Sequence, residues 1–61
     1  MNLRDEIENI VEILEESVQE SQSDSARVRK KGLENLSEFY SGRASGYEIA
    51  ALMLRRVLEN H

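Results

Sequence analysis

Residues 46–60 carry apolar side chains around more than half of the circumference of the helix that they favour. Successive helical residues are about 100° apart, so these side chains form two neighbouring stripes. The first stripe consists of Tyr47, Ala50, Ala51, Leu54 and Leu58. The second consists of Ile49, Met53 and Val57, and Leu52 lies outside both. A helix that is apolar nearly all round is normally buried on several sides, which one chain of 61 residues can hardly provide.

The start of this helix has a local signal of its own. Ser45 and Glu48 have the spacing of a capping box, in which a hydroxyl and a carboxylate satisfy free backbone N–H groups reciprocally. We therefore predict a helix over residues 46–60.

A second helix is predicted over residues 3–21, where apolar residues recur at spacings of three and four. They are Leu3, Ile7, Ile10, Val11, Leu14 and Val18. The Ser-rich segment 21–25 interrupts this pattern, and Ser23 or Asp24 is the expected N-cap of the next helix. Ile13 projects away from the stripe, and we interpret it as a single exposed apolar residue.

The third predicted helix covers residues 25–41 and has one broad apolar face. That face holds Val28, Gly32, Leu33, Leu36, Phe39 and Tyr40. Gly32 costs about 1 kcal/mol relative to Ala inside a helix, and a close crossing with another helix would explain it. Ser41 and Gly42 suit a C-terminal stop, because Gly adopts positive φ readily.

These elements predict an all-α fold in a single domain, 1–61. Three short helices, at about 3–21, 25–41 and 46–60, form a helical hairpin or a three-helix bundle that oligomerisation completes. Residues 21–25 contain neither Pro nor Gly. The alternative that the first two helices form one continuous helix therefore stays open.

Self-association follows from the small size of the chain. A domain of about 60 residues buries only roughly 60% of its unfolded surface, and the chain has no Cys for disulfides. We expect a homo-oligomer, most simply a two-fold dimer. The expected interface consists of Ile49, Leu52, Met53 and Val57. The alternative is a compact three-helix core with some exposed Leu and Met side chains.

Charge divides the chain. Residues 1–25 hold one basic and eight acidic side chains, a net charge of −7, and residues 26–61 hold seven basic and four acidic, a net charge of +3. Glu8, Glu12, Glu16 and Glu20 form a row of like charge at i,i+4 spacing, which opposes the helix. Three interpretations stay open: the row faces a basic cluster of its own or a sister chain, it binds a basic partner, or it is a solvated face.

That basic cluster comprises Arg27, Arg29, Lys30 and Lys31 at the start of the predicted helix 25–41. Nucleic-acid binding is not predicted, because the chain is acidic overall with a pI near 4.9 and cations at a helix N-terminus oppose its dipole.

A phosphorylated small ligand is the alternative function. Arg29 falls within the apolar face of its predicted helix, where it either reaches out to water or pairs with a carboxylate. In the functional interpretation, a pocket between subunits combines cations with an aromatic ring that stacks on a base. Its residues would be Arg27, Arg29, Lys31, Arg43, and Tyr40 or Tyr47.

An enzyme is not predicted, and neither is a cofactor or a metal site. His61 is the single His and ends the sequence, Cys is absent, and the glycines do not have phosphate-loop spacing. No apolar run approaches the ~18–20 residues that span a membrane. The first six residues lack the order of a secretion signal, so we expect a cytoplasmic protein.

The sequence therefore predicts a small non-enzymatic regulatory protein. It self-associates through its C-terminal helix and binds a protein partner, as an adaptor, an inhibitor or an antitoxin-like molecule does. The alternative is an oligomeric sponge or sensor for a nucleotide or a similar phosphorylated ligand.

Overall fold

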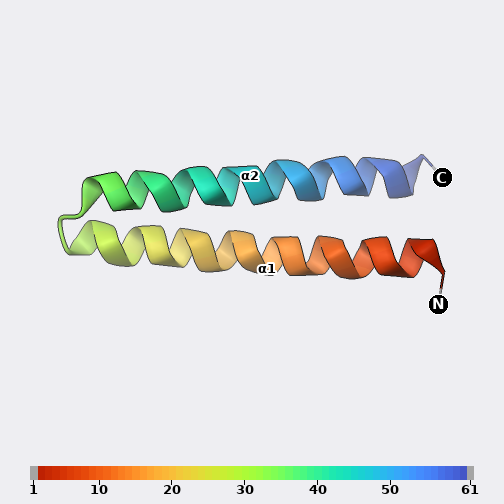
Figure 1. Ribbon diagram of the computed structural model, residues 1–61, viewed down its shortest axis with the longest axis horizontal. Helices are drawn as coiled ribbons and strands as arrows, with labels where there is room; N and C mark the ends of the chain where they lie inside the picture. Colours follow the sequence, from red (N-terminus) through yellow and green to blue (C-terminus); the bar gives the residue numbers. More distant parts are fainter. Residues whose placement is uncertain (1, 61) are drawn as a thin grey trace.

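A computed structural model describes residues 2–60 as two long helices, α1 (Leu3–Lys30) and α2 (Glu34–Glu59). The helices lie antiparallel and side by side, so both ends of the chain meet at one end of the molecule (Figure 1). The molecule measures 45 × 18 × 10 Å, a single layer of two helices. The predicted all-α class is confirmed, and the prediction of three helices is wrong.

The first helix begins at a side-chain cap. Asn2 has extended backbone angles, and its side-chain oxygen accepts a hydrogen bond from the Asp5 backbone N–H at 2.9 Å. Asp5 and Glu6 lie in the first turn, where negative charge interacts favourably with the helix dipole. The beginning of α1 therefore satisfies the usual chemical requirements of a helix N-terminus.

α1 does not stop at the Ser-rich segment, so the predicted N-cap at Ser23 or Asp24 is wrong. Ser21 and Ser25 are buried against α2, at 4% and 6% exposure. A serine is a poor helix former mainly because it competes for backbone hydrogen bonds, and here packing between helices decides. The open alternative, continuation of the helix through residues 21–25, is confirmed.

The chain instead reverses at Gly32, which has φ +79°. Gly32 N–H donates to the Arg29 carbonyl at 2.9 Å, and Leu33 N–H donates to the Val28 carbonyl at 3.0 Å. This pair of bonds is the Schellman motif, which places a residue with positive φ just after a helix. Gly32 therefore ends α1, and its predicted place inside a helix is wrong.

The second predicted break is also absent. α2 continues through residues 41–46, so neither the stop at Gly42 nor the capping box at Ser45 is used. Ala44, in the middle of this segment, is 3% exposed and packs against α1. Burial of this face of α2 keeps the helix continuous.

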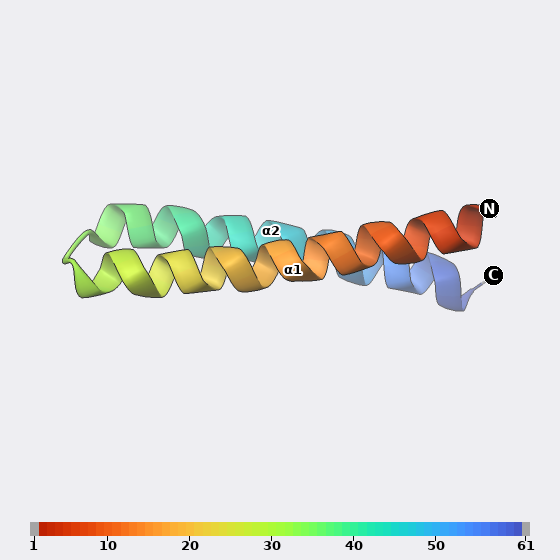
Figure 2. The same ribbon diagram turned by 90° about the horizontal axis from the view of Figure 1, so that it is seen from below.

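The helices meet along one seam with a seven-residue repeat. In α1 the seam positions alternate spacings of four and three, and in α2 spacings of three and four, as in a coiled coil. The α1 residues are Ile7, Val11, Leu14, Val18, Ser21, Ser25 and Val28. The α2 residues are Ser37, Tyr40, Ala44, Tyr47, Ala51, Leu54 and Leu58. All are buried or half-buried, and the helices cross at a shallow angle (Figure 2), as this repeat requires.

Near the turn, the seam is built from hydrogen-bonded serines. The Ser25 Oγ lies 2.9 Å from the Ser37 carbonyl oxygen, the Ser37 Oγ and the Ser41 Oγ. The Ser37 Oγ donates in turn to the Ser25 carbonyl at 3.2 Å. Small side chains allow the helices to lie close together, and each buried hydroxyl has a partner, which avoids the cost of an unsatisfied polar group.

Gly32, in the turn, and Gly42, inside α2, should respond in opposite directions to replacement by Ala. Gly32→Ala should lower the free energy of unfolding by about 1–2 kcal/mol, because Ala is strained at positive φ. Gly42→Ala should raise it by about 1 kcal/mol, because Gly42 is exposed, helical and has open space around a Cβ. Urea unfolding at one protein concentration, followed by circular dichroism, measures both. Equal effects would contradict the assigned turn.

The close packing around the serine cluster predicts that a larger side chain at Ser37, which is 1% exposed, destabilises the hairpin. Ser37→Leu should lower the free energy of unfolding by about 1–3 kcal/mol through overpacking. Ser45→Leu is the matched control, because Ser45 is exposed; its effect should stay within about 0.5 kcal/mol. A Ser37→Leu chain as stable as the parent would show that the helices do not pack closely there.

Candidate functional site: the apolar flank

The flat hairpin has two flanks of opposite character, one on each side of the seam. One, the apolar flank, lies at positions that again repeat at spacings of three and four, and Asp24, Arg27 and Arg43 occupy some of these positions. Its apolar residues are exposed or half-buried. They are Leu3, Ile10, Ile13, Leu36, Phe39, Ala50, Met53 and Val57. The other, the polar flank, is formed by Glu8, Glu12, Glu15, Gln19, Gln22, Glu48, Leu52 and Arg55.

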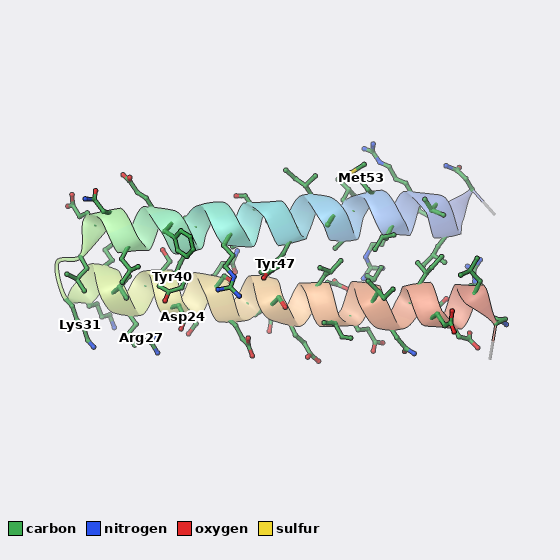
Figure 3. The ribbon with its side chains drawn as sticks, in the orientation of Figure 1. Asp24, Arg27, Lys31, Tyr40, Tyr47 and Met53 are labelled. Atoms are coloured by element: carbon green, nitrogen blue, oxygen red, sulfur yellow. The ribbon has the colours of Figure 1, made fainter. Side chains whose placement is uncertain are left out.

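Large side chains on the apolar flank are open to solvent. Met53 is 62% exposed, Ile13 61% and Phe39 60%. Met53 projects into solvent from α2, whereas Tyr40 and Tyr47 extend from the same helix toward α1 (Figure 3). Monomeric proteins rarely expose many large apolar side chains on one face without a use for them.

The flank is continuous across the two helices near the chain ends. Leu3 and Ile7 from α1 and Val57 and Leu58 from α2 line one shallow groove there. On the α2 part of the apolar flank, Leu36 and Phe39 lie near the turn, and Met53 and Val57 lie near the ends of the chain. The two helices thus contribute to one apolar surface.

On the polar flank one ion pair and one hydrogen bond link the two helices, and a second ion pair lies within α1. Arg55 bonds the Glu15 carboxylate, and Arg4 lies 3.4 Å from Glu8 and donates to the Leu58 carbonyl at 3.2 Å. These groups are about half exposed, so each pair contributes only about 0–1 kcal/mol. They favour one antiparallel register but add little stability.

The structure separates the four residues of the predicted subunit interface. Met53 and Val57 lie on the apolar flank, Leu52 lies on the polar flank, and Ile49 faces outward. Sequence reasoning did not include Phe39 and Leu36, because it assigned them to the core of a separate helix. Their spacing to Met53 and Val57, counted in sevens along one helix, is the signal that joins them. The interface itself stays a prediction.

The residues of the predicted ligand pocket are also divided. Arg29 lies on the polar side of the turn, in a shallow groove with Glu34, Ser37 and Glu38. Arg27 is bonded to the Asp24 carboxylate at 2.9 Å. Asp24, Arg27, Tyr40 and Tyr47 lie along one stretch of the hairpin, with Lys31 at the turn (Figure 3).

Arg43 joins this stretch through Tyr47. Its Nε donates to the Tyr47 hydroxyl at 3.1 Å, and its guanidinium lies 5.5 Å from the centre of the same ring. The hydrogen bond to Tyr47, with a smaller attraction from Asp24, raises the pKa of Arg43 above its ordinary value. Asp24 is thus a carboxylate placed among cations, and it opposes the binding of a further anion.

The fold also bears on the acidic row of α1. The basic cluster lies at the C-terminal end of the same straight helix, so it cannot fold back onto Glu8 or Glu12. In this position its cations interact favourably with the helix dipole. Other cations of the same chain lie beside the row instead: Arg4 is 3.4 Å from Glu8, and Arg55 lines a groove together with Glu8 and Glu12.

Within residues 2–60 no group of three or more acidic, His or Cys side chains is placed to hold a metal ion. His61 lies outside the described residues. Neither described helix has a stretch long and apolar enough to cross a membrane. Comparison with family models, curated proteins and solved structures gives no match for this chain.

The position of Asp24 predicts weak anion binding. Inorganic phosphate, AMP or ATP at 5 mM should raise the Tm no more than sodium chloride at the same ionic strength, because Asp24 already neutralises part of the cluster. Differential scanning fluorimetry at fixed protein concentration measures the shift. Saturable stabilisation by one nucleotide, lost in Arg43→Gln, would instead support a ligand site.

Proposed function

We propose that this protein is a small non-catalytic interaction module that associates with itself through the apolar flank. The observation that carries the proposal is the row of large exposed side chains beside the seam, with Met53, Ile13 and Phe39 each about three-fifths exposed. Covering such side chains on association is favourable by roughly 25 cal/mol per Å² of apolar surface.

The size of the exposed surface supports this proposal. A compact monomer of 7.0 kDa exposes about 4,000 Å², and the hairpin exposes 4818 Å². The excess of roughly 800 Å² is similar to the area that each partner contributes to an interface of standard size. The buried apolar core of the hairpin consists of only Val11, Val28, Ala44 and Ala51 among the described residues.

The geometry suits a four-helix bundle made from two hairpins. On α2, the seam and the apolar flank are centred about 100° apart around the helix, from the angular step per residue. A helix in a four-helix bundle contacts two neighbours in directions roughly at right angles. In such a bundle the seam joins the two helices of one chain, and the apolar flank joins the two chains.

Self-association leaves the polar flank and the outer faces free for another molecule. We propose that the assembled bundle acts through these surfaces as an adaptor or inhibitor of a protein partner. Leu52, half exposed among the charged groups of the polar flank, is the apolar anchor that such a partner would contact.

A single added charge on the apolar flank should separate the subunits. Met53→Glu places a carboxylate in the proposed interface, and its desolvation opposes association. Light scattering should give a mass of at least twice 7.0 kDa for the parent chain and a much lower mass for Met53→Glu. Ile49→Glu and Leu52→Glu make the same change on the outward face and the polar flank, and both should keep the oligomer mass.

Circular dichroism of each variant completes the test. Loss of helix together with loss of mass in Met53→Glu still places the residue in the interface, because both controls carry an equal added charge. The proposal fails if the parent chain is monomeric, if Met53→Glu retains the oligomer mass, or if all three variants lose it equally.

A further inference from the structure

We infer that the second copy packs on the apolar flank in the reverse direction, with its turn over the chain ends of the first. This inference rests on the proposed function and adds the orientation of the partner. It follows from the order of apolar and charged residues along the two helices.

The large apolar residues of the α2 flank are placed nearly symmetrically about its middle, with Arg43 and Ala50 on either side of Gly46. Leu36 and Phe39 lie toward one end, Met53 and Val57 toward the other, and Gly46 lies between them. When two copies of α2 run in opposite directions about Gly46, Leu36 meets Val57 and Phe39 meets Met53 of the other copy. Large apolar side chains are then covered at both ends of the interface.

Gly46 fits the centre of this arrangement. A Cβ built on Gly46 has no atom within 4 Å, so packing inside the hairpin does not require glycine there. Without a side chain, two copies of α2 approach closely at the two-fold axis. Ser17, the small residue at the middle of the same flank on α1, lies at nearly the same level along the hairpin.

Charge favours the same orientation. The half of the hairpin that holds the chain ends, residues 1–17 and 46–61, has three basic and eight acidic side chains, a net charge of −5. The half that holds the turn, residues 18–45, has five basic and four acidic side chains, a net charge of +1. Reversed packing places unlike halves together, and packing in the same direction places the two acidic halves together.

Spin labels measure the orientation directly, because the chain has no native Cys. Asn35→Cys places one label near the turn, and Glu59→Cys places one near the chain ends; both sites are exposed. Reversed packing about Gly46 predicts a long separation of about 33 Å along the helix axis between the two Asn35 residues, because each lies eleven residues from Gly46 and the rise is about 1.5 Å per residue. A mixed sample of the two variants should give a short distance of about 20 Å, two helix diameters.

The outcomes separate this inference from the proposed function. A short distance between two Asn35 labels means same-direction packing, which overturns the inference and leaves self-association intact. Absence of any dipolar coupling means a monomer, which overturns the proposed function as well. The long Asn35 distance together with the short mixed distance supports the reversed arrangement.

Discussion

A layer of two helices has one seam, and everything else about this protein depends on how that seam is filled. Serines and alanines occupy much of it, so the helices lie close together while little apolar surface is buried. Hydroxyls that bond one another near the turn satisfy the polar groups that this packing buries. The large apolar side chains therefore lie beside the seam, where a single chain leaves them exposed.

The sequence predicted the helical class and the excess of apolar surface, because both depend on spacing and residue type. It misplaced the turn, since local signals compete: Ser23, Gly42 and the Ser45–Glu48 pair all resemble helix ends. Packing overrides them, as Ser25 and Ala44 are buried between the helices. Cations at 27–31 followed by Gly32 were the correct signal, because basic residues and then glycine typically end a helix.

The candidate site was partly predictable for a related reason. Met53 and Val57 were recognised from the stripe on the last fifteen residues, but Leu52 and Ile49 were grouped with them. Phe39 and Leu36 were missed, because only an unbroken α2 brings them into register with Met53. The exposed rows of a helix are thus predicted only after its true ends are known.

We propose that the hairpin is half of a larger bundle, in which the seam joins the two helices of one chain and the apolar flank joins two chains. Sedimentation equilibrium of the unmodified protein over a hundredfold concentration range tests this most directly. Reversible conversion toward twice the 7.0 kDa chain mass, with helix content rising alongside, is the predicted result. A fully helical species that keeps the mass of one chain at every concentration would contradict it.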